Sequence, residues 1–439
     1  MSNFVQQALV RQLDAPAWLD VRQQRGRDLS AGRSLPNFRV EDWKYTSLRA
    51  LEEGCFVGAP ASPLEQAGLD KHFHIEGLDS YRLVFVDGRF SAELSAVGDL
   101  PAGVTLVPFS QAGEAEAAHI SERLGGLAAP ESRLFTALND SWLAEGVYLR
   151  VARNTRVERP IQLVWLTTPQ PSPAGLAQRL LLELEEGSEA SVLEQFVSSD
   201  DGRNTFTNGV SELLVADNAH LHHCRLHLEG AGALHIGTVQ ASLGRAATLS
   251  GFHMALGGVL KRIDLTMRMR GEGAHCELNG VYLPRNQEVV DYHTCLEHEV
   301  PNCTSNETFR GIIADRARAV FSGRIHIHRD AQKTSAHLSN RNLLTSDRAE
   351  VDTKPELEIY ADDVQCSHGA TVAQLDETQM HYLRTRGISE QEARVLLSFG
   401  FINEILNRIH REPLRNYLRP HLANQFAQDQ DPSLTRHLL

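Results

Sequence analysis

The sequence predicts a mainly β protein in which a β-solenoid is flanked by helical regions. Two observations support this prediction. From about residue 145 to 370 the chain reads as short alternating strands without a convincing helix, and a short motif recurs through the same region. A sustained repeat of strand and turn without crossover helices is typical of a solenoid, whose coils stack on one another. A β-sandwich is the competing all-β fold, but it does not require one repeat period over so much chain.

The repeated motif is an alanine, any residue and then a mostly apolar residue, preceded by turn-type or charged residues. Successive copies lie 29, 28, 27, 43 and 32 residues apart, and each copy opens a strand. The 43-residue interval is expected to hold an extra partial coil. The six copies begin at Ala190, Ala219, Ala247, Ala274, Ala317 and Ala349.

The predicted domains are residues 1–130, mostly helical, residues 131–370, the solenoid, and residues 371–439, helical. In the first, "DAPAWLDVRQQRG" predicts a helix that is capped by Asp14 and ends at Gly26. The stretch "VEDWKYTSLRAL" spaces its apolar residues as a second helix would. The stretch "YRLVFVDGRFS" predicts two strands joined by a turn at Asp87-Gly88.

Two helices are predicted after Ala370. Asp376 marks the start of the first and Gly387 its end, while Ser389 and Glu392 form a capping box for the second. The second helix carries an apolar stripe, which ends at Ile409 and is wide enough to bind a partner as well as to pack on the solenoid. The candidate partner-binding residues are Leu396, Phe399, Ile402, Ile405 and Leu406.

Composition argues against several classes of function. The formal net charge is -13 and no basic run occurs, so nucleic acid is not expected as a partner. We expect a cytoplasmic protein without a membrane partner, because the chain has neither a signal-like start nor a long apolar stretch. No lysine follows a glycine, so a phosphate loop is absent and any nucleotide chemistry must come from a partner. The cysteines contain no C-x-x-C pair and are expected to be free thiols or ligands.

The stretch "YADDVQCSHGATVAQLDE" places Cys366 and His368 two residues apart on a predicted strand. Side chains at i and i+2 project from the same face of a strand, so the thiol and the imidazole should point together. Val364 shares that face, which indicates a side that is buried or covered by a partner. Such a pair suits a soft or borderline metal, although a free cysteine can also simply fill a core.

Two segments carry a family resemblance. Residues 340–388, "NRNLLTSDRAEVDTKPELEIYADDVQCSHGATVAQLDETQMHYLRTRGI", resemble the C-terminal signature of the SufB/SufD family. Residues 35–48, "LPNFRVEDWKYTSL", are similar to the N-terminal signature of its SufD branch. The resemblance implies a right-handed parallel β-helix flanked by helical domains.

The resemblance also implies a role in iron-sulfur cluster assembly. In that family SufD pairs with SufB, and each binds the ATPase SufC through its C-terminal helices. The expected function is therefore a non-catalytic SufD-type scaffold subunit with SufB and SufC as partners, or a homodimer where SufB is absent. The expected cofactor is an iron-sulfur cluster or iron, held transiently and shared with SufB. Whether a flavin takes part is left open.

Carried over to this chain, the family's site histidine falls on His368, with Cys366 beside it, near the expected SufB interface. Both are candidate ligands of the cluster or of iron. SufB-type chains have a cysteine where this chain has Ala349. This departure implies that the principal sulfur-accepting thiol belongs to the partner.

Other clusters and functions compete with this interpretation. A purely structural SufC-binding subunit is one alternative. A β-helix carbohydrate-active enzyme is another, but Asp362 and Asp363 are adjacent and would face opposite ways on a strand, a poor arrangement for an acid/base pair. Two further groups could hold zinc or iron, although a solvated surface is the commoner explanation. They are His220, His222 and Cys224, and His293, Cys295, His298 and Cys303.

Overall fold

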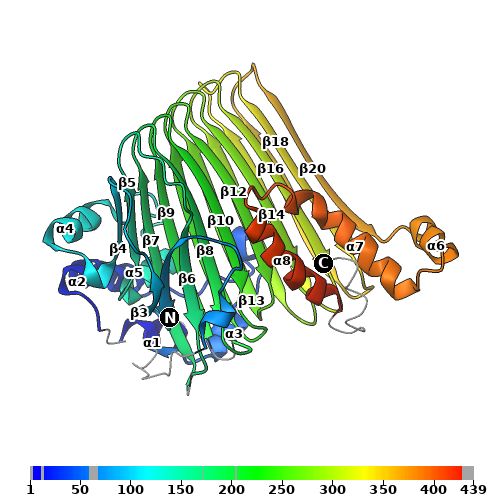
Figure 1. Cartoon of the computed structure of the whole chain (residues 1–439), viewed down its shortest axis with the longest axis horizontal. Coiled ribbons are helices and arrows are strands. Elements are labelled where there is room, and N and C mark those ends of the chain that lie inside the picture. Colours follow the sequence, from blue (N-terminus) through cyan, green and yellow to red (C-terminus); the bar gives the residue numbers. More distant parts are fainter. Residues whose placement is uncertain (1–2, 11–13, 59–67, 171, 203–204, 428–439) are drawn as a thin grey trace.

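The chain folds into a parallel β-solenoid with helices at both ends of the sequence (Figure 1). The computed structural model describes residues 3–10, 14–58, 68–170, 172–202 and 205–427. No helix in these ranges is long and apolar enough to cross a membrane. The predicted absence of helices between residues 145 and 370 is confirmed for the described residues.

Two sheets form the solenoid. Sheet A consists of β4 (Val104–Pro108), β5 (Val147–Val151), β7 (Ala174–Leu184), β9 (Thr205–Val215), β11 (Leu234–Leu243), β13 (Leu260–Met269), β15 (Val289–His298), β17 (Arg318–Ile327) and β19 (Glu350–Ile359), with β1 (Val57–Gly58) paired to β7. Sheet B consists of β2 (Tyr81–Val86), β3 (Arg89–Ala96), β6 (Ile161–Thr167), β8 (Glu189–Ser198), β10 (His220–Leu228), β12 (Thr248–Leu256), β14 (His275–Leu283), β16 (Thr304–Ile313), β18 (Ser335–Leu344) and β20 (Gln365–Gln374).

Consecutive strands alternate between the two sheets, so each pair from β5 and β6 to β19 and β20 forms one coil. Strands of neighbouring coils run parallel, and their register repeats with the coil: His220 lies opposite Thr248, which lies opposite His275. This alternation confirms the predicted solenoid.

The corner before each sheet B strand explains the turn residues and the alanines. Asn218, Ala246 and Asn302 adopt left-handed backbone conformations with φ of 55°, 52° and 60°. The backbone N–H of Asn218 donates to the Arg245 carbonyl of the next coil at 2.8 Å. The small residue that follows each of these positions is buried, for example Ala247. A larger side chain would have no room there, which is why small residues recur at coil spacing.

The sequence motif nevertheless mixes three different positions. Ala219 occupies the corner before a sheet B strand, whereas Ala317 and Ala349 occupy the corner before sheet A strands. The 43-residue interval is therefore one coil plus half a coil, which agrees with the predicted extra partial coil. Ala190 is not at a corner, because its register partner is Leu221, two residues beyond Ala219. Because small buried residues occur at both kinds of corner, copies of the sequence motif fall at different structural positions.

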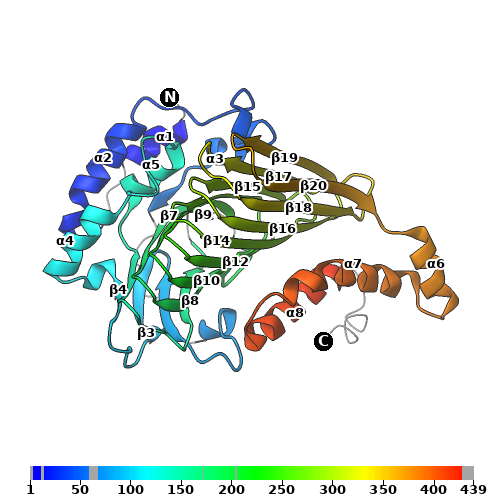
Figure 2. The ribbon, with the colours of Figure 1, turned by 90° about the horizontal axis from the view of Figure 1, so that it is seen from above.

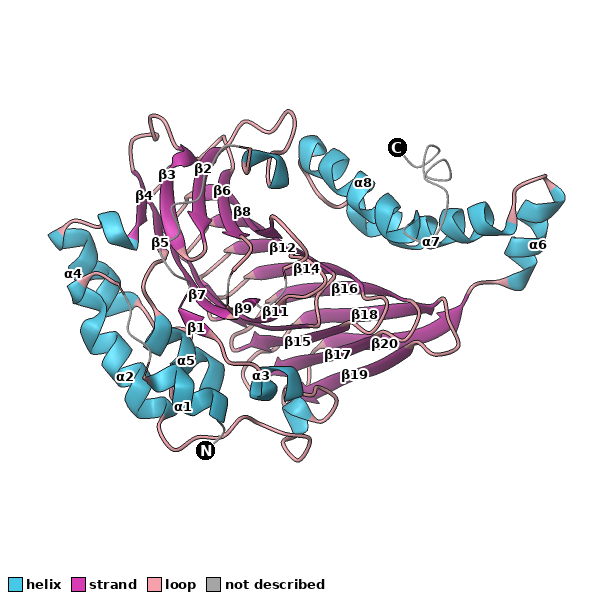
Figure 3. Cartoon of the chain, turned by 90° about the horizontal axis from the view of Figure 1, so that it is seen from below, coloured by secondary structure: helices cyan, strands magenta, loops and turns pink. Residues whose placement is uncertain are grey.

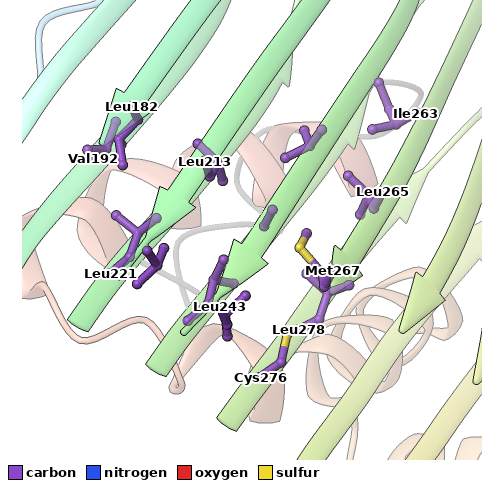
Figure 4. Packing of buried hydrophobic residues seen from close by; sticks show 14 of the residues in the cluster. Leu182, Val192, Leu213, Leu221, Leu243, Ile263, Leu265, Met267, Cys276 and Leu278 are labelled. Atoms are coloured by element: carbon purple, nitrogen blue, oxygen red, sulfur yellow. The ribbon is translucent and has the colours of Figure 1, made fainter. Parts of the chain in front are cut away.

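The inward side chains of both sheets form the main core, in which like residues of successive coils stack (Figure 4). Leu182, Leu213 and Ala241 form one such row along sheet A. Several strands are apolar on their outer face as well. Outward residues of that kind need a cover, and the terminal helices provide it (Figure 2).

The N-terminal helices pack against the outer face of sheet A. Phe4, Trp43 and Trp142 meet Phe206 and Ile236 there. The helices of this region are α1 (Asn3–Leu9), α2 (Asp20–Ser30), α3 (Arg49–Glu53), α4 (Glu114–Arg123) and α5 (Leu134–Trp142). Residues 1–130 also contribute β1 to β4 to the two sheets, so this region shares the solenoid's hydrogen bonding.

Three local predictions for this region can be compared with the structure. The hairpin is confirmed: β2 and β3 are antiparallel and turn at Asp87-Gly88, both with positive φ. The helix predicted to end at Gly26 instead runs to Ser30, and Asp14 does not cap it. A Cβ at Gly26 would lie 2.4 Å from the Ser141 backbone nitrogen, so this glycine permits close packing of α2 on α5 and does not end the helix.

The predicted helix over "VEDWKYTSLRAL" is wrong as a single element. A 3-10 turn covers Glu41–Trp43, and α3 begins only at Arg49. The intervening Thr46 is buried and donates its hydroxyl to Asp291 at 2.5 Å. This contact with sheet A fixes the segment more strongly than helical propensity does.

The last two of the three C-terminal helices pack on the outer face of sheet B, and the first contacts α7. The three helices are α6 (Glu377–Thr385), α7 (Glu390–Leu406) and α8 (Glu412–Ala427). The predicted caps are confirmed: the Asp376 side chain accepts from the first turn of α6, and Ser389 and Glu392 form a reciprocal capping box.

The last coil is not covered. β19 pairs only with β17 and β20 only with β18, so each strand leaves one edge free in the described part of the chain. Along β20 only Cys366 is half-buried, and the other side chains are exposed. On β18, by contrast, every second side chain from Ala336 to Asn342 is buried. Figure 3 shows both strands at the margin of the molecule. We call β19 and β20 the free end.

Candidate functional site

Cys366 and His368 lie together on the inward face of the free end. Their register partners on β18 are Ala336 and Leu338, and both of these belong to the buried core. Strand alternation therefore points the thiol and the imidazole into the solenoid, as the spacing predicts. Because no further coil follows, Cys366 is only half-buried and His368 is exposed.

A hydrogen-bonded group lies beneath the adjacent part of β20, where Asn340 and Asn342 are the register partners of Ala370 and Val372. Asn340 donates to the Tyr282 hydroxyl at 2.9 Å, and Asn342 donates to Asn340 at 2.6 Å. Thr353, on β19, joins the group by donating to Asn340 at 2.8 Å. Because both asparagines are fully buried and have hydrogen-bonding partners, they form a fixed floor for the free end.

The Cys366 thiol is a soft metal ligand and the His368 imidazole a borderline one, and no strand covers their outer side in the described part of the chain. Desolvation raises the pKa of the Cys366 thiol above its ordinary value, so the free thiol is protonated at neutral pH. A metal ion or a neighbouring base would have to remove that proton. Two ligands are fewer than the four of a closed tetrahedral site, so further ligands must come from another molecule.

The predicted partner-binding stripe divides into two parts. Ile402, Ile405 and Leu406 are fully buried between α7 and the outer face of sheet B. Leu396 and Phe399 are only half-buried, beside Val395 and Ala423. Of the five residues, only these last two have surface to offer a partner without movement of α7.

Ala349 lies at the corner that begins β19. It is 7 % exposed and packs with the main core, on the chain segment that leads into the free end. SufB-type chains were expected to have a cysteine at this position. It directly precedes β19, the first strand of the free end.

The histidines of β10 occupy two environments. His220, His222 and Cys224 face outward, and His223 and His227 face inward, as alternation predicts. The outward face is not fully solvated, because His222 and Cys224 lie beneath the connection between α7 and α8. The group on β15 is divided: His293 and Cys295 face outward from sheet A, His298 faces inward, and Cys303 lies at a corner.

Sequence analysis missed an ion-pair network inside the solenoid. The side chains of His227, Glu229 and His235 are fully buried and close enough together to suggest a metal site. The Lys261 ammonium already provides the cation, because it lies 3.0 Å from Glu229 Oε2 and also donates to the Glu229 carbonyl oxygen at 3.4 Å. Despite desolvation, Lys261 and His235 hold the pKa of Glu229 at about 2.

The remaining contacts of this network confirm that the charges of the cluster are balanced by its own side chains. Arg225 donates its Nε–H to His227 Nε2 at 3.1 Å, which occupies that nitrogen's lone pair. Desolvation lowers the pKa of both His227 and His235, so the two imidazoles are neutral at neutral pH. The alternation within "AHLHHCRLH" placed these inward residues on one face, but only the fold brings Glu229 and Lys261 to them.

The last coil of the solenoid is bare and carries a half-buried thiol and an exposed imidazole, so it has surface that another chain could cover. Comparison with known proteins gives the family. Residues 166–401 match the SufBD core domain of the SUF system for FeS cluster assembly, and residues 5–163 match the SufBD protein N-terminal region. The chain belongs to the SufBD family, as its two signature segments predicted.

Several relatives are similar along most of the chain. An iron-sulfur cluster assembly protein SufD from Escherichia coli is 36 % identical over 87 % of this chain and 87 % of its own length. An iron-sulfur cluster assembly SufBD family protein from Synechocystis is 32 % identical over 91 % of this chain and 89 % of its own. The chloroplastic protein ABCI7 of Arabidopsis thaliana is 30 % identical over 91 % and 85 %.

Proposed function

We propose that the chain is a SufD-type scaffold subunit whose free end pairs with SufB and supplies half of a shared cluster-assembly site. The observation that carries this proposal is the position of Cys366 and His368 on the last strand of the solenoid, inward-facing and incompletely covered. Family membership supplies the reaction, the assembly of iron-sulfur clusters. The cluster, or iron, is then the cargo of the site, shared with SufB and released.

The edges of β19 and β20 support the pairing with SufB. An unpaired strand edge is a template for another strand, and natural proteins usually cover or charge such edges. Here the inward positions of the last coil also expose apolar side chains: Ile359 is 40 % exposed and Val372 49 % exposed. A second SufBD-type solenoid docked there would hydrogen-bond the edges and bury this surface. A second copy of this chain is the alternative occupant where SufB is absent.

The C-terminal helices support a docking site for SufC. The chain has no phosphate loop, so an ATP-driven step needs a partner that has one. Of the predicted stripe, Leu396 and Phe399 are the residues through which α7 can reach SufC, since Ile402, Ile405 and Leu406 pack on sheet B. We place the whole assembly in the cytosol, as the sequence predicts, with no catalytic role for this subunit.

Pairing at the free end is tested by replacing Val372 with lysine. Val372 shares the inward face with Cys366 and His368, and an ammonium group buried there against a partner would cost several kcal/mol. We expect Val372→Lys to weaken association with SufB at least about a hundredfold, measured by gel filtration of the purified chains mixed in pairs.

The matched control is Thr371→Lys. Thr371 is also exposed, but its side chain faces outward, opposite Arg341. It should associate with SufB nearly as the parent does, and both variants should keep the parent's β-rich circular dichroism spectrum. A folded Val372→Lys chain that binds SufB as tightly as the parent would refute docking at the free end.

A further inference from the structure

A groove separates the outer face of sheet B from the connection between α7 and α8. Its volume is about 310 Å³, near the lower end of the range of about 300 to 1,000 Å³ that small-molecule sites have. Outward side chains of β8, β10 and β12 form one wall, and residues 408–411 form the other. The groove is therefore large enough for a small molecule, and distant parts of the chain enclose it.

The base of the groove is apolar. Leu193 of β8, Phe252 of β12 and Leu414 of α8 line it, and all three are buried in the cluster that packs the C-terminal helices on sheet B. The half-buried Leu78 lines the groove beside them. An apolar group that entered the groove would leave water for a hydrophobic surface, which favours its binding.

Arg411 brings an unbalanced positive charge to the groove. It is half-buried, and its Nη2 group donates to two neutral acceptors, the Glu158 carbonyl oxygen at 3.1 Å and the Ser191 hydroxyl at 3.3 Å. Desolvation lowers the pKa of Arg411, and the acid that opposes this shift, Glu158, has a side chain that is 80 % exposed. No carboxylate of the described residues forms an ion pair with Arg411, so its charge has room for a partner.

The other charged side chains that line the groove are paired. Arg408 lies 3.5 Å from a Glu277 carboxylate oxygen, and Glu189 lies 3.4 Å from the Arg156 guanidinium. These pairs leave the guanidinium of Arg411 as the charge to which an incoming ligand can respond.

His222 adds an unused polar atom to the same groove. Its Nδ1 is buried and has no hydrogen-bonding partner in the described part of the chain. Desolvation and the neighbouring His410 lower the pKa of His222, so its ring is neutral at pH 7 and adds no second charge. A neutral imidazole with its proton on Nδ1 can still donate one hydrogen bond to a ligand.

We propose that this groove binds a small amphiphilic carboxylate, such as a medium-chain fatty acid, with the carboxylate at Arg411 and the apolar part on the base. One unbalanced guanidinium suits a monoanion, and a carboxylate forms strong charge-assisted hydrogen bonds with it. The Nδ1 of His222 can donate to the same ligand. A phosphate group would bring a second negative charge that nothing in the groove balances.

This site is separate from the free end. The groove lies over β8, β10 and β12, whereas Cys366 and His368 are on β20, at the last position in sheet B. The proposal therefore does not rest on the cluster-assembly function.

The test is isothermal titration calorimetry of the full chain, with octanoate as the probe and octanol as its uncharged counterpart. We expect one octanoate per chain, bound at least about tenfold more tightly than octanol. Arg411→Gln should weaken octanoate binding at least about tenfold and leave octanol binding unchanged. Because octanol binding requires an intact groove, its retention shows that the variant is folded.

A second variant, Ser250→Phe, fills the groove. Ser250 is half-buried, lines the groove and is the register partner of His222, so a phenyl ring there would occupy the space of the apolar chain. This variant should bind neither ligand and should keep the parent's circular dichroism spectrum. The control is Arg386→Gln, which removes the same charge from an exposed position just after α6 and should bind both ligands as the parent does.

Three results would overturn the proposal. The parent chain could fail to bind octanoate, it could bind octanol as tightly as octanoate, or octanoate binding could survive Arg411→Gln or Ser250→Phe. Each of them would mean that the groove does not recognise an amphiphilic carboxylate.

Discussion

The complex that contains His368→Ala is expected to assemble normally with SufB and SufC but to build no clusters. His368 is exposed on the last strand and contributes little packing, so its loss should not loosen the complex. It does supply nitrogen lone pairs, which a cluster-assembly site needs as ligands. The measurement is the iron-sulfur absorption band during reconstitution of the purified complex, together with its elution volume in gel filtration.

The matched control for this experiment is His337→Ala. His337 is also exposed and lies on the neighbouring strand, but it faces outward and bonds to Ser367 at 2.7 Å. Clusters should form on that variant at the parent's rate. Cys366→Ala should have a smaller effect than His368→Ala, because Ala349 implies that the main thiol comes from SufB. If the His368→Ala complex builds clusters at the parent's rate, the subunit is a structural SufC-binding component only.

Glu307→Gln is expected to stabilise the chain at alkaline pH. Glu307 faces the interior of the solenoid and is 1 % exposed, and neither of its carboxylate oxygens has a hydrogen-bonding partner among the described residues. Desolvation raises its pKa from 4.5 to about 8. The carboxyl group is therefore neutral in the folded chain at pH 7 and ionised in the unfolded chain.

The sign of the effect follows from this difference in proton binding. Between pH 4.5 and about pH 8 the folded chain holds a proton that the unfolded chain has released, so the free energy of unfolding falls as pH rises. The slope is about 1.4 kcal/mol per pH unit. The amide of glutamine cannot ionise, so the variant should lose this slope and gain about 3 kcal/mol over the parent between pH 5 and pH 8.

Urea unfolding of both chains at the two pH values measures this gain. Glu158→Gln is the control, because the Glu158 side chain is 80 % exposed. It should change the free energy of unfolding by the same small amount at both pH values. A Glu307→Gln chain whose advantage over the parent does not grow between pH 5 and pH 8 would contradict a neutral, buried Glu307.

Much of the fold could be predicted from the sequence because it depends on local periodicity. Alternation along strands placed Cys366 and His368 on one face, and coil spacing predicted the solenoid. The caps at Asp376 and Ser389 were predicted for the same reason, since a cap depends on residues within one turn.

The errors lie where distant segments decide the structure. Gly26 looked like a helix end, but it serves the contact with α5, more than a hundred positions along the chain. The apolar stripe on α7 was expected both to pack on the solenoid and to reach a partner, and only the fold shows that Ile402 is among the residues covered by sheet B. The pairing of Glu229 with Lys261, and the approach of His410 to His222, also arise from folding alone. No local pattern in the sequence predicts contacts of this kind.

The most direct test of the free end as a shared site is the alkylation rate of Cys366, followed by mass spectrometry of the free chain and of its complex with SufB. Cys366 is half-buried in the free chain, and Cys55 is exposed in the N-terminal region and provides an internal control. A docked partner should slow alkylation of Cys366 at least about tenfold and leave the rate at Cys55 unchanged. Equal rates at Cys366 in the free chain and in the complex would mean that SufB does not cover this end of the solenoid.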